Sequence, residues 1–532
     1  MTRRPRIVLY QPQQVNQRIG HQGSFDMLPL EMLHIAAIPV HRGYDVQIID
    51  ASLYSIEEGH RLALEASAGA DIFGITAILG YMVRDGHECA LQVKAAYPGI
   101  HIIAGGWFPS CLPGAYLESG IYDAVCLGQG ENTFWEFVQA IESGTSLEAV
   151  PGLALWREGQ VVKTTGRSVS GWEEFPRVPW HLIDIAPYRD RQLHRTRDKT
   201  RNRMPSPPSV GPGNPYFGIT YFSSYGCPEP CPFCCSPIVT GRRWKALPAN
   251  RLLDDVEELK ERWDFDVLRF HDANFGVHEA RTKEFAKGLI DRNIDIEWTC
   301  MIETNSILHY QPDTLDLLKA SRLYTAQIGA ETSDQTTLET YVKKPFHEGD
   351  NVLAAREMHK RKIISSLTYV IGFPGEPEWS MMKTLDEARR IVSECPTVSA
   401  HVFPFRPIPG SKLFEEALGM GYRPPQTLDE WGSQLEYQFT DTWKDNVPPA
   451  VKKHLQLYYQ YASFVHRLVR PNKNGLIERL SEWRLRTGNY KFPIDLRAYY
   501  ALARFMRWSR HREDLDPSWV MSSENERVAS ID

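Results

Sequence analysis

Apolar runs of strand length alternate with segments of helical spacing in two separate series along this chain, and this alternation limits the fold more than any other feature. The first series occupies residues 1–145. Crossover helices between parallel strands cover both faces of one sheet, so these residues are predicted to form a doubly wound, Rossmann-like α/β domain. Its strands are expected at residues 7–10, 46–49, 70–78, 102–104 and 124–127. Such sheets bind ligands at the carboxyl ends of their strands.

The second series occupies residues 216–425 and contains six strand candidates with helix candidates between them. Consecutive β-α units of this kind predict a partial (β/α)6 barrel of the TIM type. Chemistry in such barrels lies at the carboxyl ends of the strands. The strands are expected at residues 217–222, 267–270, 296–301, 325–328, 366–371 and 399–403.

Residues 146–215 connect the two series and differ from both in composition. Residues 151–162 are typical of a small hairpin with its turn at Glu158-Gly159. Residues 189–203 are dense in arginine, and residues 205–215 are rich in proline, which excludes regular helix or sheet from that part. The sequence therefore predicts a hairpin followed by a solvated basic linker or mobile lid.

Residues 426–532 are predicted to form a helical region that covers the barrel mouth. Four aromatic side chains of this region are expected in the core, with a pocket for a large apolar substrate as the alternative; they are Tyr458, Tyr459, Tyr461 and Phe464. Three arginines are expected on a solvated helix face, with contact to an anionic group or a membrane surface as the alternative; they are Arg497, Arg504 and Arg507.

The overall composition is that of a globular protein, with 42% hydrophobic and 24% charged residues. The formal net charge of −6 argues against a nucleic-acid partner. No apolar stretch reaches the roughly 18 to 20 residues of a membrane-spanning helix. No apolar run of signal-peptide length follows the basic residues 1–6. We therefore expect a cytoplasmic protein without a transmembrane segment.

Four of the nine cysteines crowd into residues 227–235, a density that indicates metal ligation more than disulfides. Cys227, Cys231 and Cys234 have the spacing C-x3-C-x2-C and follow the first barrel strand. Three thiolates hold a four-iron cluster with one iron open, which can chelate the amino and carboxylate groups of a small molecule. A structural zinc site with Cys235 as fourth ligand is the alternative, but no second cysteine pair or paired histidine lies nearby.

With Phe233 as the aromatic residue, the spacing C-x3-C-x-aromatic-C resembles the signature of the radical S-adenosylmethionine (radical SAM) superfamily. Three segments that follow later strands, residues 271–274, 329–331 and 371–376, fit the same family pattern. The resemblance implies a [4Fe-4S] cluster that reduces bound S-adenosylmethionine to generate a 5′-deoxyadenosyl radical. It also implies an S-adenosylmethionine site formed by Phe233, Asp272, Asn274, Gly329, Glu331, Gly372 and Pro374.

The N-terminal domain resembles the cobalamin-binding domain of the cobalamin-dependent radical SAM subfamily. The matching segments are Gly105-Gly106-x-x-Pro109 and Gly128-x-Gly130-Glu131, and the loop from Thr76 to Tyr81 is placed to reach the same site. The D-x-H-x-x-G motif of cobalamin-dependent mutases is absent, which removes a histidine ligand for the lower face of cobalt. The resemblance implies cobalamin contacts at Thr76, Tyr81, Gly105, Gly106, Pro109, Gly128, Gly130 and Glu131.

The same resemblance extends to class B methylases and to anaerobic magnesium-protoporphyrin IX monomethyl ester cyclases. It implies methylation of an unactivated carbon in a natural-product, tetrapyrrole or lipid-like small molecule, with a reductant such as flavodoxin or ferredoxin as electron donor. Oxidative cyclisation without methyl transfer is the alternative reaction. A cobalamin or redox sensor is the alternative of another class, although no DNA-binding helix pair is evident.

Overall fold

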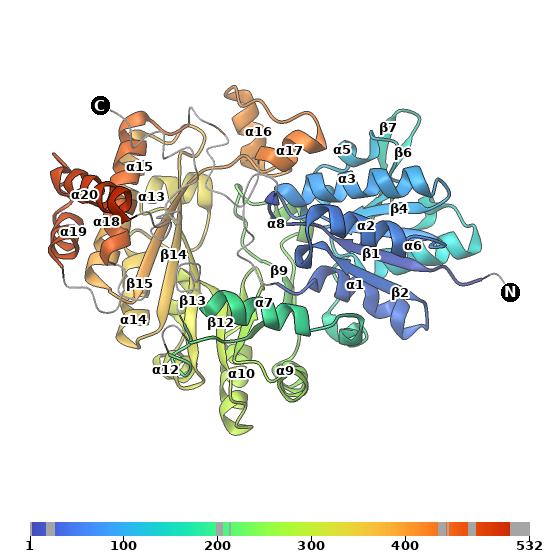
Figure 1. Ribbon diagram of the computed structural model, residues 1–532, viewed down its shortest axis with the longest axis horizontal. Helices are drawn as coiled ribbons and strands as arrows, with labels where there is room; N and C mark the ends of the chain where they lie inside the picture. Colours follow the sequence, from blue (N-terminus) through green and yellow to red (C-terminus); the bar gives the residue numbers. More distant parts are fainter. Residues whose placement is uncertain are drawn as a thin grey trace.

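The computed structural model describes residues 3–17, 27–197, 206–211, 214–434, 443, 446–465 and 475–510. Its N-terminal part is built on a seven-stranded sheet in the order β2-β1-β3-β4-β5-β6-β7 (Figure 1). The parallel strands are β1 (Ile7–Gln11), β2 (Val46–Asp50), β3 (Ile72–Thr76), β4 (His101–Gly105) and β5 (Ala124–Cys126). This order and these crossovers confirm the doubly wound domain.

The predicted hairpin also forms, and it belongs to the same sheet. Strands β6 (Leu153–Arg157) and β7 (Gln160–Lys163) pair antiparallel to each other, and β6 pairs antiparallel to β5. The N-terminal sheet therefore extends beyond residue 145, where the sequence predicts the domain to end. An antiparallel hairpin needs no crossover helix, so it can extend the sheet within a few residues.

Helices cover both faces of this sheet. On one face, α1 (Leu30–His41) packs against α6 (Glu131–Ser143), and on the other α2 (Ile56–Ala66) packs against α3 (Tyr81–Ala96). Two short helices follow β4 directly, α4 (Trp107–Cys111) and α5 (Pro113–Leu117). Strands β1 and β3 are buried along their whole length, as expected for a sheet covered on both faces.

The segment that connects the two domains, residues 146–215, is anchored more firmly than the sequence predicts. After the single turns η3 (Leu147–Ala149), η4 (Trp172–Glu174) and η5 (Trp180–Leu182), it forms helix α7 (Ala186–Arg197). Tyr188 Oη of α7 donates to Asp50 Oδ2 over 2.6 Å, and the Gln192 amide exchanges two hydrogen bonds with the backbone of Gly218. The expectation of a solvated lid is therefore wrong for α7, because its buried face is tied to both domains. Residues 198–205 lie outside the described residues.

The second part is a six-stranded parallel sheet in the order β15-β14-β13-β12-β11-β8, which confirms the partial barrel. Its strands are β8 (Gly218–Tyr221), β11 (Val267–Phe270), β12 (Glu297–Glu303), β13 (Leu323–Glu331), β14 (Ile364–Ile371) and β15 (Val398–Pro404). The helices around it are α9 (Ala249–Trp263), α10 (Glu279–Asp291), α11 (Thr304–His309), α12 (Pro312–Ala320), α13 (Gln335–Thr337), α14 (Asp350–Lys360) and α15 (Glu378–Glu394). A small antiparallel pair, β9 (Ser224–Gly226) and β10 (Trp244–Ala246), flanks helix α8 (Ser236–Thr240).

Two further groups of helices follow the barrel. Helices α16 (Lys412–Gly419) and α17 (Leu428–Gln434) reach across to the N-terminal domain, where α17 packs on α3 (Figure 1). Helices α18 (Pro449–Val465), α19 (Leu476–Thr487) and α20 (Ile494–Arg510) lie instead on the far side, where α18 and α19 pack against α15 and α20 packs on α19. The expectation that the C-terminal helices cover the barrel mouth is therefore wrong for α18 to α20.

Tyr458 and Tyr461 of α18 are core residues, as the sequence predicts, and Tyr459 is half-buried against the same core. Tyr458 Oη donates to Ala400 O over 2.6 Å, and Tyr459 Oη donates to Val402 O and accepts from Val402 N. These hydroxyls bond to the free edge of β15, which would otherwise expose unpaired backbone groups. The side chains of Arg504 and Arg507 lie outside the described residues, so their role stays a prediction.

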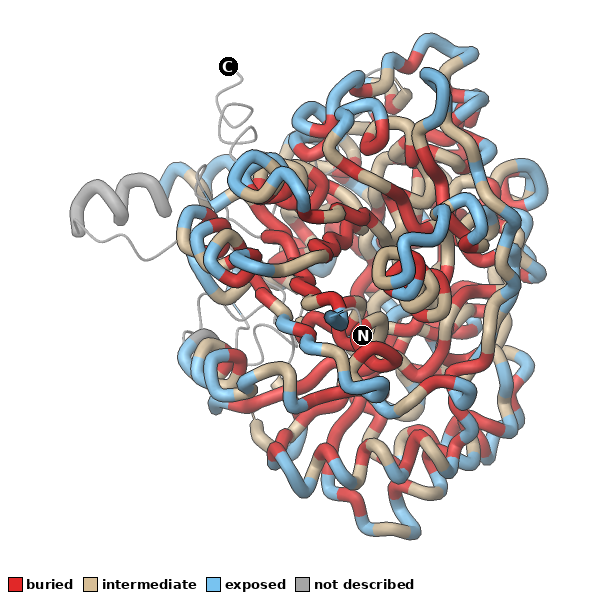
Figure 2. The backbone as a smooth tube through the Cα atoms, turned by 90° about the vertical axis from the view of Figure 1, so that its right-hand side faces the viewer, coloured by how far each residue is buried: buried red, intermediate tan, exposed pale blue. Residues whose placement is uncertain are grey.

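The two domains share their apolar cores. Leu28, Leu30 and Leu33, at the start of α1, belong to the cluster that fills the barrel. Phe373 and Phe405, which follow barrel strands, belong to the cluster of the N-terminal domain. Figure 2 shows buried residues along the central strands and exposed residues on the surrounding helices. Among the described residues, no helix is both long and apolar enough to cross a bilayer.

Candidate cofactor-binding site

The cysteine loop leaves the barrel mouth through a turn that only glycine can make. Gly226 ends β9 with φ +84°, and a β-carbon there would lie within 2.0 Å of Arg243 O. The loop then carries Cys227, Cys231 and Cys234, all of them free thiols. Among the described residues, no three Cys, His, Asp or Glu side chains gather around one point as in an occupied metal site.

The environment of these thiols opposes their ionisation. Burial raises the pKa of Cys227 to about 12 and also raises the pKa of Cys231. A hydrogen bond with Cys235, together with burial, raises the pKa of Cys234. Thiolates in such a loop need a bound cation to be stable, and metal binding supplies one. The donor set therefore fits an iron–sulfur cluster, which is bound as thiolates.

A buried lysine joins two carboxylates beside the cysteines. Lys344 Nζ lies 2.7 Å from Glu303 Oε2 and 2.5 Å from Glu331 Oε1, at the carboxyl ends of β12 and β13. Burial alone would lower the Lys344 pKa, but the two carboxylates raise it well above its ordinary value. The Cys231 thiol lies within electrostatic range of Lys344. The sequence predictions include Glu331 but not Glu303 or Lys344.

The backbone around this triad is unusual. Glu331 has φ +58° at a bulge in β13, a left-handed conformation that is uncommon for non-glycine residues. A π-helix spans Leu338–Val342 just before the lysine, and such turns are frequent at functional sites. Gly329 leaves the space for the triad, because a β-carbon there would lie 2.7 Å from Lys344 Nζ. Gly329 and Glu331 both lie beside Lys344, and their predicted contact with S-adenosylmethionine stays a prediction.

The loop after β14 is held by its own glutamate. Glu376 Oε2 accepts from Gly372 N over 2.7 Å and from Phe373 N over 3.1 Å. The Phe373 ring lies 5.7 Å from that of Phe233 and stacks on Tyr341. Phe233 therefore lies beside the loop that carries Gly372 and Pro374, and contact of these residues with S-adenosylmethionine stays a prediction.

Asp272 and Asn274 reach the mouth, but their side chains already have partners. Asp272 is fully buried and accepts from Ser223 N, Ser223 Oγ and Ser224 Oγ over 2.5–2.7 Å. Asn274 Oδ1 accepts from Gly276 N. Asp272 thereby fixes the segment between β8 and β9 that precedes the cysteine loop. Direct contact of these two residues with S-adenosylmethionine stays a prediction.

The loops at the carboxyl edge of the N-terminal sheet are cross-linked. Gly106 has φ +98°, and a β-carbon there would lie 2.6 Å from Ala77 O, so the loop after β4 crosses directly over the loop after β3. Ser110 Oγ donates to Gly106 O and accepts from Gly128 N, which joins the loops after β4 and β5. The residues predicted to contact cobalamin at the ends of β3, β4 and β5 therefore lie along one edge of the sheet. Their contact with cobalamin itself stays a prediction.

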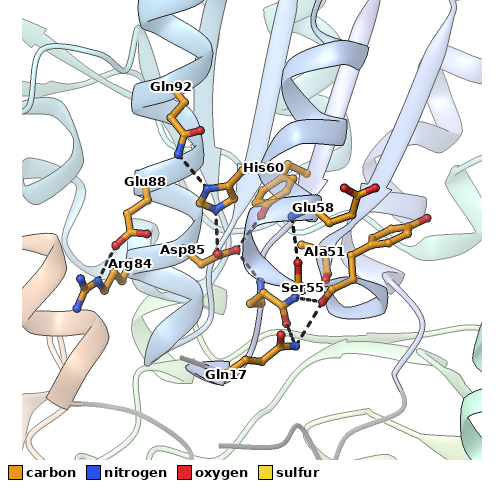
Figure 3. A network of polar contacts seen from close by, with 12 residues as sticks. Gln17, Ala51, Ser55, Glu58, His60, Arg84, Asp85, Glu88 and Gln92 are labelled. Atoms are coloured by element: carbon orange, nitrogen blue, oxygen red, sulfur yellow. Dashed lines mark hydrogen bonds and ion pairs between the residues drawn. The ribbon is translucent and has the colours of Figure 1, made fainter. Parts of the chain in front are cut away.

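A buried polar network is centred on Asp85 of α3 (Figure 3). Asp85 Oδ2 accepts from Tyr10 Oη and from Gln13 N, and Asp85 Oδ1 lies 3.0 Å from His60 Nε2. The Gln13 side chain bonds to Ala51 O and, over 2.8 Å, to Tyr54 O. The network therefore ties the loop after β1 to the loop after β2. Sequence patterns did not indicate it, because Asp85 and His60 lie on different helices.

Two protein-family models match the parts of the chain that carry these loops. The model of the radical SAM superfamily matches residues 221–388, and that of the B12 binding domain matches residues 19–138. The chain is a radical SAM protein with an N-terminal B12-binding domain. The matched ranges contain the cysteine loop and the cross-linked edge described above.

Relatives of this radical SAM protein cover most of its length. An uncharacterized methyltransferase, PH0819, from Pyrococcus horikoshii is 24% identical and aligns with 75% of this chain and 82% of its own. The cytidylyl-2-hydroxyethylphosphonate methyltransferase of Streptomyces wedmorensis is 24% identical over 75% of this chain and 79% of its own. The anaerobic magnesium-protoporphyrin IX monomethyl ester cyclase of Rubrivivax gelatinosus is 24% identical over 73% and 66%.

Solved structures share the fold of this radical SAM protein. The cobalamin-dependent S-adenosylmethionine radical enzyme OxsB matches 99% of this chain and 82% of its own, with a TM-score of 0.66 and 15% identity. The radical S-adenosylmethionine methyltransferase TsrM from Kitasatospora setae matches 79% and 76%, with a TM-score of 0.60 and 16% identity. Both likenesses confirm the predicted two-domain α/β architecture.

The B12-binding edge of this radical SAM protein has groups suited to a polar ligand. Gln11 is buried at the carboxyl end of β1, and no hydrogen-bond partner of its Oε1 is found among the described residues. Burial raises the pKa of Glu131, at the start of α6, to about 7. A β-carbon at Gly105 would make only an ordinary contact, 3.7 Å from Cys126 Cβ. These observations fit a large cofactor lying on this edge.

Proposed function

We propose that this protein is a cobalamin-dependent radical SAM enzyme that methylates an unactivated carbon of a small molecule. Cys227, Cys231 and Cys234 would hold a [4Fe-4S] cluster, and the loops after β13 and β14 would hold S-adenosylmethionine. Cobalamin lies on the edge formed by the loops after β3, β4 and β5. When bound, these groups supply a 5′-deoxyadenosyl radical and a transferable methyl group.

The observation that carries the proposal is the direct contact between the two cofactor edges. Helix α8 begins immediately after the cysteine loop and packs on α4 of the B12-binding domain. The loop of Gly128 is equally close, because a β-carbon there would lie 3.0 Å from Val239 O of α8. A radical and a methyl donor must reach the same substrate carbon, and this arrangement brings their sites to one interface.

The residues of this chain hold and orient these groups. Lys344 is placed to bind the carboxylate of S-adenosylmethionine, because it is a buried cation next to the thiols. Glu303 and Glu331 keep that lysine charged and fixed in position. The aromatic rings of Phe233, Phe373 and Tyr341 pack together at the loop after β14. Asp272 holds the approach to the cysteine loop.

The relatives support methylation and also leave a second candidate. Five of the seven curated relatives carry methyltransferase or methylase in their names, among them enzymes of a bacteriochlorophyllide, a phosphonate and a hopanoid. Two are magnesium-protoporphyrin ester cyclases, which supports oxidative cyclisation as the alternative. We propose a natural-product, tetrapyrrole or lipid-like substrate, and a flavodoxin or ferredoxin as electron donor.

The test begins with anaerobic purification and reconstitution with iron, sulfide and hydroxocobalamin. We expect about four irons per chain, as in a [4Fe-4S] cluster, and a stoichiometric amount of cobalt. Reduced enzyme is then incubated with S-adenosylmethionine and a panel of tetrapyrroles, hopanoids and nucleotidyl phosphonates. Methylation yields S-adenosylhomocysteine and 5′-deoxyadenosine in equal amounts, whereas cyclisation yields 5′-deoxyadenosine alone. Iron without cobalt would overturn the methylation proposal.

A further inference from the structure

A run of cations lies beside the cysteine loop. Arg242 and Arg243 directly precede β10 and Lys245 lies within it, and all three side chains are exposed. Strand β10 pairs antiparallel with β9, and β9 leads directly into Cys227. The cations therefore belong to the same small structural unit as the proposed cluster ligands.

Strand geometry turns two of these cations toward solvent. Trp244, which lies between them, points inward, because its Nε1 donates to Asn274 O over 3.0 Å. Successive side chains of a strand alternate between its two faces. Arg243 and Lys245 therefore share the outer face of this strand, where both are exposed and their charges can meet a partner.

The third cation touches the cysteine loop itself. Gly241 and Arg242 both have left-handed backbone conformations, with φ +59° and +58°. This turn brings Arg242 Nε to 3.2 Å from Pro228 O, to which it donates a hydrogen bond. Pro228 directly follows Cys227, so positive charge lies against the backbone of the loop that is proposed to hold the cluster.

An exposed apolar side chain completes this surface. Ile238 of α8 is 56% exposed and lies a few residues before the cations. Among the described residues, no ion pair joins any of the three cations to a carboxylate. Glu229, the acidic residue of the cysteine loop, is half-buried, so the surface keeps an excess of positive charge. We call Ile238, Arg242, Arg243 and Lys245 the basic patch.

We propose that the basic patch is the docking surface for a small acidic electron-carrier protein. In the bound pair the reduced carrier loses one electron and the cluster gains it, and no proton or other group is transferred. Opposite charges steer such encounters and raise their rate by about 10 to 1,000-fold. A small patch is sufficient, because electron-transfer complexes bury little surface. The inference rests on the proposed function for the cluster, and it adds the surface at which the electron donor binds.

The test is stopped-flow reduction of the oxidised, reconstituted full-length protein by a reduced bacterial flavodoxin. The double variant Arg243→Glu/Lys245→Glu should lower the second-order rate constant at least about tenfold at low ionic strength. This difference should nearly vanish at about 1 M salt, where the Debye length is about 3 Å. Reduction by photoexcited deazaflavin, a small uncharged reductant, needs no docking and should be unchanged. Arg486→Glu, at an exposed position of α19 on the side of the barrel away from the N-terminal domain, is the control (Figure 1).

Binding is measured as well, so that the surface is tested without the cluster. Isothermal titration calorimetry of oxidised flavodoxin with the cluster-free full-length chain should show binding that is at least about tenfold weaker in the double variant. Ile238→Ser should also weaken binding, but with the salt dependence of the wild type, because it removes an apolar contact and no charge.

The outcomes separate docking from the other proposals. Rates and affinities of the double variant equal to those of the wild type would overturn the docking surface. A loss of the same size in Arg486→Glu would also overturn it, because only net charge would then matter. So would a wild-type cluster that deazaflavin reduces and flavodoxin does not. Low iron content in the wild type would count against the proposed function instead, while the calorimetry would still decide whether the patch binds the carrier.

Discussion

Lys344 Nζ lies 2.5 Å from Glu331 Oε1 in a nearly buried ion pair, and Glu303 completes a triad on the same lysine. Removing one member of such a group leaves an uncompensated buried charge. The triad connects β12, β13 and the π-helical turn, and it borders the cysteine loop. Its integrity should therefore matter both for stability and for binding of S-adenosylmethionine.

Lys344→Met should lower the free energy of unfolding by about 3–5 kcal/mol, the usual effect of breaking a buried pair. It should also weaken S-adenosylmethionine binding to the reconstituted protein by more than about tenfold, or 1.4 kcal/mol. Urea unfolding and equilibrium dialysis measure the two effects. Lys343→Met, in the exposed neighbour, is the matched control. Equal effects of the two substitutions would contradict the assignment.

Alanine at Cys227, Cys231 or Cys234 should abolish the cluster, because three thiolates are the minimum set for a four-iron cluster with one open iron. Iron analysis and the visible spectrum after reconstitution check this. Cys300→Ala, in a buried cysteine of β12, is the control for loss of a core thiol. If Cys235 proved essential and Cys231 dispensable, the ligand register would be wrong.

Gly106→Ala should disrupt the B12-binding edge, because a β-carbon there would lie 2.6 Å from Ala77 O and the backbone has φ +98°. We expect a loss of about 1–3 kcal/mol in stability, the usual cost of such a backbone conformation. Cobalt content after reconstitution should fall, while iron content stays. Gly105→Ala is the control for stability, since its nearest neighbour would be 3.7 Å away. Normal cobalt content in Gly106→Ala would refute the placement of cobalamin.

Asp85→Ala should remove the support of the loops after β1 and β2. Tyr10 Oη and Gln13 N would lose their acceptor inside the domain. Each buried donor left without an acceptor lowers the free energy of unfolding by about 1–3 kcal/mol. We expect weaker cobalamin binding with an unchanged cluster, measured by optical titration and iron analysis of the same sample. Glu88→Ala, one turn further along α3, is the control. A fall in iron content equal to that in cobalt would show a general folding defect instead.

Glu131 should make stability depend on pH. Burial raises its pKa from 4.5 to about 7, so between these values the folded protein holds a proton that the unfolded chain has lost. The stability that this proton contributes is fully present below about pH 4.5 and is lost as the pH rises to about 7. Over this window the free energy of unfolding falls by up to about 1.4 kcal/mol per pH unit. Glu131→Gln should therefore gain stability relative to the wild type over this window in urea unfolding of the cofactor-free protein. Glu118→Gln, at an exposed position, should show no such trend.

Local patterns in the sequence determined the two β-α series, the cysteine spacing and the glycines after β4 and β5. Each of these depends on residues close together in the chain, where periodicity and steric limits act directly. The strands predicted at residues 102–104 and 267–270 agree with β4 and β11 to within one residue at each end. The carboxyl ends of parallel strands lie on one edge, so the candidate loops could be grouped before the structure was known.

The contacts that join distant segments were decided only by the tertiary structure. Asp50 and Tyr188 are 138 residues apart, and Lys344 reaches Glu303 across 41 residues. The contact of α4 with α8 and the anchoring of α7 likewise depend on how the two domains pack. No local periodicity encodes such pairs, because the same lysine, cysteine or tyrosine in an exposed setting would leave an identical pattern in the sequence. Packing and desolvation determine which of these side chains form a site, and both act only in the folded chain.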